Sequence, residues 1–164
     1  MKEQLLNNIE LELKLLKQLA CFIEEKDLSY KPTEQVRTAF ELMQYLSTIG
    51  SYMMRWIVKS DINDEVRQQV REFRSSLTLQ NFPERIDQQW LEIKKYFSEI
   101  NDSDLNDKMV TLPTKDTMLM GAAIISSVIK WLAVYRMELF LYLKMNGHQQ
   151  LSTREAWVLA VQEA

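Results

Sequence analysis

The stretch TMLMGAAIISSVIKWLAVYRMELFLYLKM, residues 117–145, decides the fold class of this chain. It is apolar on almost every side, and its only charges are Lys130, Arg136, Glu138 and Lys144. A membrane span would place Lys130 in mid-bilayer at a cost of about 2.5–3.5 kcal/mol, and no basic clusters flank the stretch in compensation. We therefore interpret it as a helix buried on several sides inside a bundle. Asn146-Gly147 is typical of the stop that ends such a helix.

Apolar residues recur at helical spacing in further segments on either side of this one. A first helix is predicted from about Leu5 to Lys26. A second long helix begins between Thr33 and Thr38, where Thr38 and Glu41 have the spacing of a capping box, and continues to about residue 59. A third begins at Pro83, since proline fits the first position of a helix, and continues to about residue 100.

Shorter elements fill the connections. A short amphipathic helix is predicted over residues 66–77, and another follows Leu151. Residues 105–117 form the longest irregular segment, in which 109–113 can make a brief extended pairing. The sequence therefore predicts a single domain, 1–164, that is an all-α, up-and-down four-helix bundle with short extra helices.

Composition supports one helical domain and excludes several functions. The 164 residues are 46% hydrophobic and include only three Gly and three Pro, too few turn-formers for a sandwich or barrel of short strands. A net charge of −3 with mixed signs argues against a nucleic-acid partner. A lone cysteine excludes an internal disulfide framework, and the amphipathic N-terminus lacks a signal core, so we expect a cytoplasmic protein without a membrane partner.

The residues needed for common catalytic chemistry are scarce. The chain has one histidine, His148, and one cysteine, Cys21, whereas zinc, iron and nucleophile-base sites need several such groups. We expect His148 on an exposed turn and Cys21 as a buried, inert thiol. The three glycines are far apart and form no phosphate-binding loop. No metal or other cofactor is predicted.

Three arginines in the short helix, Arg67, Arg71 and Arg74, resemble an anion-binding patch. Glu65 and Glu72 lie between them, and this mixture of signs favours a solvated helix face. We expect these arginines to face solvent.

Several segments together resemble the DinB-like superfamily. Tyr30-Lys31-Pro32 followed by RTAFELMQY, residues 37–45, is similar to that family's second helix, in which a proline-bearing loop precedes a capped E-L-L-x-H. WLAVYRMEL, residues 131–139, and YLKMNG, residues 142–147, resemble the run H-x-x-x-H-R-G-Q-[IL] that ends in Y-L-[RK]-x-x-G. The resemblance covers nearly the whole chain and implies the family's four-helix bundle and a homodimer.

The resemblance also implies an altered site. Metal-binding members of the family use three histidines, which fall on Tyr45, Trp131 and Tyr135 of this sequence. Tryptophan has no lone pair for a metal, and a tyrosinate must be made from a phenol with a pKa of about 10. The family's arginine is retained as Arg136. Metal-dependent thiol transfer, the activity of some relatives, is therefore disfavoured.

Several functions remain open. The leading hypothesis is a non-catalytic protein in which the three aromatics either fill the vacated site or line a metal-free pocket for a small, partly apolar molecule. Arg136 or Arg37 is then available for an acidic group. One alternative is a metal-independent transferase or isomerase acting on a small thiol-type substrate, with Tyr45 or Tyr135 as general acid. Another is a structural homodimeric interaction protein.

Overall fold

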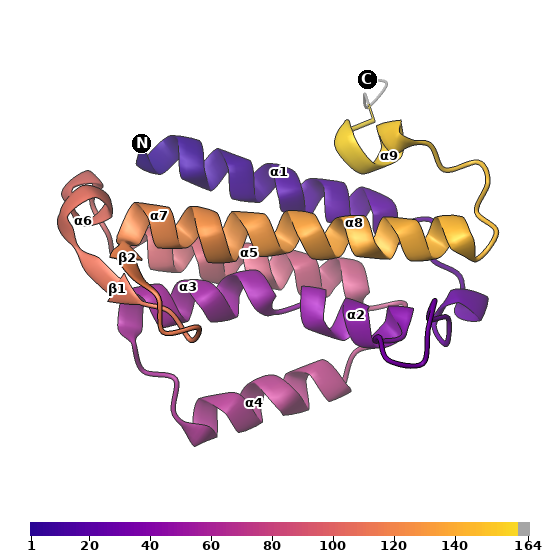
Figure 1. Cartoon of the computed structure of the whole chain (residues 1–164), viewed down its shortest axis with the longest axis horizontal. Helices are drawn as coiled ribbons and strands as arrows, with labels where there is room; N and C mark the ends of the chain where they lie inside the picture. Colours follow the sequence, from indigo (N-terminus) through magenta and orange to yellow (C-terminus); the bar gives the residue numbers. More distant parts are fainter. Residues whose placement is uncertain (161–164) are drawn as a thin grey trace.

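Four helical columns form the body of the molecule (Figure 1). The structure is a computed structural model and describes residues 1–160. The columns are α1 (Lys2–Ala20), α2 (Ala39–Leu46) with α3 (Ile49–Lys59), α5 (Phe82–Ser98), and α7 (Met120–Ile124) continued by a π-helical turn (Ile125–Ile129) and α8 (Lys130–Met145). The connections hold a 3-10 turn (Glu25–Asp27), α4 (Asp64–Ser75), α6 (Asp102–Asp107), the strands β1 (Met109–Thr111) and β2 (Thr117–Leu119), and finally α9 (Thr153–Trp157). The prediction of an all-α four-helix bundle with short extra helices is confirmed.

The direction of the columns refines the simple up-and-down order. Gly50 in α3 contacts Gln89 in α5, and Lys59 further along α3 pairs with Glu99 just after α5, so these two columns are parallel. The reason is α4, which returns the chain along the length of the bundle before α5 begins (Figure 1). The order is therefore up, down, down, up, and α4 lies outside the four columns.

The second column is interrupted, so the prediction of one continuous helix to residue 59 is wrong. The chain leaves helical geometry at Thr48, with φ −138° and ψ −20°, before α3 begins. Gln89, a buried side chain of α5, bonds to both sides of the break. Its Oε1 accepts from the amides of Gly50 and Ser51 at 2.6 and 3.3 Å, and its Nε2 donates to the Leu46 carbonyl at 2.9 Å. A neighbouring helix thus satisfies backbone groups that the break leaves free.

Close approach of α3 and α5 depends on Gly50. A Cβ atom built at this position would lie 2.9 Å from Oε1 of Gln89 and 3.1 Å from the Ile93 side chain. Glycine therefore allows the Gln89 amide to reach the backbone of α3.

The ends of several elements differ from the predictions. The first helix ends at Ala20 rather than near Lys26, because the following residues turn toward the buried Asp27. Thr117 lies in β2 instead of starting a helix, and β2 pairs antiparallel with β1, which confirms the extended pairing anticipated at 109–113. The Thr38–Glu41 capping box is confirmed, with Glu41 N–H donating to Thr38 Oγ1 at 3.2 Å.

Among residues 1–160, no helix has the length and apolarity that crossing a membrane requires. The apolar stretch that opens at residue 117 instead supplies core side chains from several faces: Met120, Ala123, Ile124, Val128, Leu132, Leu139, Phe140 and Leu143 are all buried.

Two single residues lie in environments opposite to those predicted. His148 is buried at 2% exposure, with Nε2 at 2.8 and 3.0 Å from the carboxylate oxygens of the equally buried Asp27. The chain reverses at Gly147, whose φ of 100° turns His148 back toward the connection after α1. Cys21 is exposed, because it lies one residue beyond the buried Ala20 and therefore points to another side of the helix end.

Candidate functional site

Two of the three aromatics at the predicted site touch each other. The rings of Tyr45, from α2, and Tyr135, from α8, pack edge to face with centroids 4.8 Å apart and an interplanar angle of 73°. Trp131 lies one turn before Tyr135 and lines the same cavity as Tyr45. The structure therefore brings all three predicted aromatics to one side of the bundle.

A cavity of about 650 Å³, which we call the aromatic groove, remains open beside them. Its wall is built by four separate segments, two columns of the bundle, α4 and the β1–β2 hairpin. The lining residues are Tyr45, Ile49, Tyr52, Met53 and Trp56 from α2 and α3, Arg67, Val70, Arg71 and Arg74 from α4, Leu112, Pro113 and Lys115 from the hairpin, and Trp131 from α8. The volume is in the range of small-molecule sites, roughly 300–1,000 Å³.

The sides of the aromatic groove are held by specific contacts. Nε1 of Trp56 donates to the Thr111 carbonyl at 2.8 Å, which fixes the hairpin against α3. Gln44 Nε2 donates to the Arg74 carbonyl at 3.0 Å, which joins α2 to the end of α4. The hairpin and α4 are thus attached to the same column on either side of the opening.

Two guanidinium groups lie on the ring of Tyr45. The Cζ atoms of Arg37 and Arg74 are 4.7 and 4.9 Å from its centroid, and Arg37 is also 5.8 Å from the centroid of Tyr135. These distances allow cation–π attraction. Arg37, predicted as available for an acidic group, therefore lies beside Tyr45, one of the lining residues, but does not itself line the groove.

The surroundings of this cluster shift the pKa values of Tyr45 and Arg74. Burial, reinforced by Tyr135, raises the pKa of Tyr45 to about 12 against the opposing effect of Arg74 and Arg37. Burial also lowers the pKa of Arg74. Its Nε donates to Thr48 Oγ1 at 2.6 Å, a neutral partner that leaves the guanidinium charge without compensation.

Arg136 lies apart from the groove. Its guanidinium is fully buried between α1 and α9, with Nε and Nη2 at 2.9 and 2.8 Å from Glu12 Oε2, and Nη1 donates to the Ala156 carbonyl. Consecutive helical residues point to different sides, so the residue after Tyr135 faces the other side of α8.

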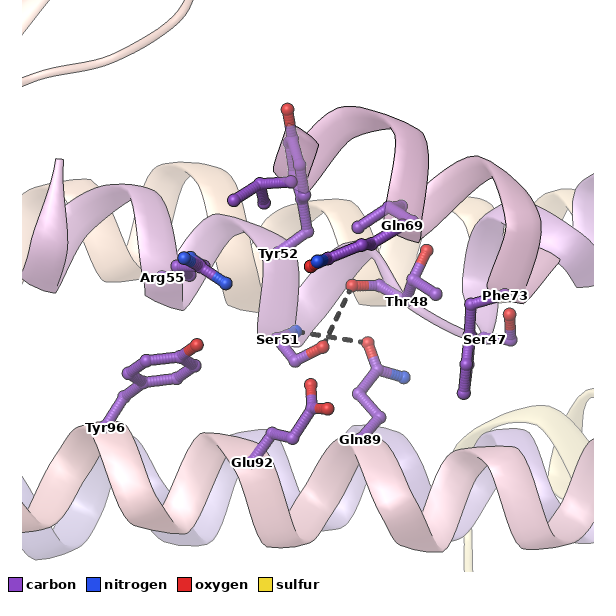
Figure 2. A pocket seen from close by; sticks show the side chains of 12 residues that line it. Ser47, Thr48, Ser51, Tyr52, Arg55, Gln69, Phe73, Gln89, Glu92 and Tyr96 are labelled. Atoms are coloured by element: carbon purple, nitrogen blue, oxygen red, sulfur yellow. Dashed lines mark hydrogen bonds between the residues drawn. The ribbon is translucent and has the colours of Figure 1, made fainter. Parts of the chain in front are cut away.

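A second, smaller cavity lies between α3, α4 and α5 (Figure 2). Its volume is about 180 Å³, and Tyr52 and Val70 separate it from the aromatic groove, since both residues line the two cavities. Figure 2 shows Glu92 and Gln89 projecting from α5 toward Ser51 of α3. This cavity is more polar than the groove and carries one carboxylate, Glu92, opposite hydroxyl groups.

Sequence reasoning missed Arg74 and Lys115 as groove residues. The signal for Arg74 was present, since Val66, Val70 and Arg74 follow one another at steps of four and therefore share a helix face. Lys115 had no signal, because its place follows from the hairpin, where it takes a left-handed φ of 71°.

The donor atoms at the groove do not match a metal site. No group of three or more His, Cys, Asp or Glu residues that could hold a metal ion occurs in the part of the chain that the structure describes.

The fold is found in solved structures of DinB-like proteins. A DinB-like protein from Bacillus subtilis, YjoA, superposes with a TM-score of 0.68 at 17% identity, over 91% of this chain and 96% of that one. A protein from Exiguobacterium sibiricum placed in the DinB family gives a TM-score of 0.68 at 15% identity, over 90% of this chain and 92% of the other. No protein-family model and no curated protein sequence matches the chain. At these identities the likeness establishes the DinB-like fold.

Proposed function

We propose that this protein is a metal-free, non-catalytic binding protein whose aromatic groove takes up a small, partly apolar molecule. The observation that carries the proposal is the open volume of about 650 Å³ between Tyr45, Trp131, α4 and the hairpin. Bulky aromatics at these positions leave room for a ligand instead of filling the core.

The chemistry of the groove supports the loss of the metal site that the family resemblance implies. By that resemblance Tyr45, Trp131 and Tyr135 take the positions of the histidines in metal-binding relatives, and an indole offers no lone pair to a metal. A tyrosinate from Tyr45 is equally unfavourable, since its pKa is raised to about 12. The three positions therefore suit an uncharged ring contact better than a divalent cation.

Catalysis by Tyr45 is disfavoured by the same argument. A general acid or base works best with a pKa near the operating pH, and Tyr45 titrates far above neutrality. This counts against the metal-independent transferase or isomerase as an account of the groove.

The test is a thermal-shift and fluorescence screen of aromatic and aliphatic metabolites, with metal content measured in parallel after exposure to Ni²⁺, Zn²⁺ and Fe²⁺. We expect binding that Trp131→Ala abolishes and Trp157→Ala leaves unchanged, since Trp157 is 58% exposed on α9, away from the groove. Stoichiometric metal bound at the Tyr45 side, or binders that are indifferent to Trp131→Ala, would overturn the proposal.

A second candidate function is a structural homodimer in the cytoplasm. Val134, Leu141 and Met145 are 53%, 46% and 60% exposed, and their spacing of seven and four residues places them on one face of α8. A second copy would bury this apolar face. Sedimentation velocity at micromolar concentration should then give a dimer that Leu141→Glu dissociates, and a monomer in the unaltered protein would remove this candidate.

A further inference from the structure

The charge of the aromatic groove is opposite to that of the chain. Four of its lining residues are cationic, Arg67, Arg71, Arg74 and Lys115, and none is acidic. Arg37 adds a further cation above Tyr45. Because the whole chain has a net charge of −3, this cluster is a local feature and not a consequence of composition.

Most of these cations have no acidic partner. Arg67 pairs with Asp64 at 3.3 Å, whereas no carboxylate lies within 4.0 Å of Arg37, Arg71, Arg74 or Lys115 among residues 1–160. A like-charged group of this kind repels itself and attracts anions.

Arg74 is the cation whose situation is most specific to a ligand. It is partly buried beside the Tyr45 ring, it lines the groove, and its Nε is fixed by the neutral hydroxyl of Thr48, which leaves its charge uncompensated. Burial removes part of the hydration of a guanidinium group, and a bound anion compensates for that loss by pairing with the charge. The planar guanidinium can also donate two parallel hydrogen bonds to one carboxylate.

The rest of the groove fits a flat apolar body. Tyr52, Trp56 and Trp131 contribute rings to the wall, and the indole N–H of Trp56 is already used by Thr111. The three rings give the wall an apolar surface, which suits an aromatic ligand.

We propose that the ligand of the aromatic groove is an aromatic carboxylate, with its carboxylate on Arg74 and its ring between Tyr45, Tyr52 and Trp131. This inference rests on the proposed binding function and adds the chemical class of the ligand. Lys115 and Arg71, both exposed at the rim, raise the local concentration of such an anion.

The test uses probes that share one ring and differ in charge: 2-naphthoate, the neutral 2-naphthamide and the cationic 2-naphthylmethylamine, with acetate as an anion that lacks the ring. Each is titrated into the full-length protein by calorimetry and by tryptophan fluorescence, to which Trp56 and Trp131 at the groove contribute together with Trp90 and Trp157. We expect 2-naphthoate to bind at least tenfold more tightly than 2-naphthamide, and the amine and acetate to bind still more weakly. The affinity for naphthoate should fall as salt is raised.

Arg74→Met assigns the contact. It should lower the affinity for 2-naphthoate at least tenfold and leave that for 2-naphthamide within twofold, with circular dichroism showing that the variant is folded. Arg154→Met removes the same charge from the exposed α9 and should change neither. Equal binding of naphthoate and naphthamide, or tighter binding of the amine, would refute the ligand class while leaving the binding function intact. Naphthoate binding that is insensitive to Arg74→Met refutes the assignment to Arg74, and failure of all aromatic probes refutes both proposals.

Discussion

Replacement of Gln89 by leucine tests how the interrupted column is stabilised. The side chain is 2% exposed and makes two short hydrogen bonds, from Gly50 N–H at 2.6 Å and to the Leu46 carbonyl at 2.9 Å, together with a longer one from Ser51. Leucine has a similar size but can form none of them.

The expected magnitude follows from the groups left without partners. One buried amide and one buried carbonyl lose their hydrogen bonds, and each unsatisfied group costs about 1–3 kcal/mol. Additional apolar burial by leucine offsets roughly 1 kcal/mol. We therefore expect Gln89→Leu to lower the free energy of unfolding by about 1–5 kcal/mol.

Urea unfolding followed by circular dichroism measures this change, and with a slope of about 2 kcal/mol/M the midpoint should fall by roughly 0.5–2.5 M. Amide hydrogen exchange at Gly50 should also accelerate more than at other buried amides. A general loss of packing would instead accelerate exchange throughout the core. Gln88→Leu is the matched control, because that side chain bonds only Glu84 on its own helix, and it should change stability by less than about 0.5 kcal/mol. A loss below about 1 kcal/mol for Gln89→Leu would refute the reasoning.

Three further outcomes are expected. Arg136→Met leaves Glu12 and the Ala156 carbonyl without their buried partner. The free energy of unfolding should therefore fall by about 3–5 kcal/mol, and proteolysis near α9 should accelerate. An unchanged cleavage rate would contradict this expectation. His148→Ala breaks the buried contact with Asp27 and should lower the free energy of unfolding by about 2–5 kcal/mol. The control Gln149→Ala, at an exposed position, should lower it by less than about 0.5 kcal/mol. Similar values for the two variants would mean that the His148–Asp27 pair does not stabilise the fold. Hydrogen bonds from the Thr38 backbone and side chain hold the pKa of Glu41 below its ordinary 4.5, so its stabilising effect is complete above pH 4.5 and is lost as the pH falls through the lowered value. The difference in unfolding free energy between Glu41→Gln and the unaltered protein should therefore shrink in acid, and a constant difference would argue against the capping role.

Periodicity predicted the columns because burial of one face leaves a repeat in the sequence, and a capping box predicted the start of α2 because the contact is local. The break at Thr48 left no such trace, since the apolar stripe continues across it and the compensating Gln89 comes from another helix. The same limit applies to His148, whose partner Asp27 is distant in sequence.

The candidate site divides along similar lines. Tyr45, Trp131 and Tyr135 could be named from the helix pattern and the family resemblance, whereas Arg136 was misplaced because sequence adjacency to Tyr135 says nothing about the side of the helix it faces. Arg74 was recoverable from its spacing with Val66 and Val70. Lys115 was not, since a hairpin tip places it.

Because α4 lies outside the four columns, its side chains can line cavities without taking part in the packing of the core. This helix has one buried residue, Val66, yet it contributes walls to the aromatic groove and to the smaller cavity beside it. Substitutions in α4 can therefore change the walls of these cavities, and with them the preferred ligand, while the packing of the four columns stays unchanged. The residues that line the two cavities from α4 can thus change while the core of the bundle keeps its sequence.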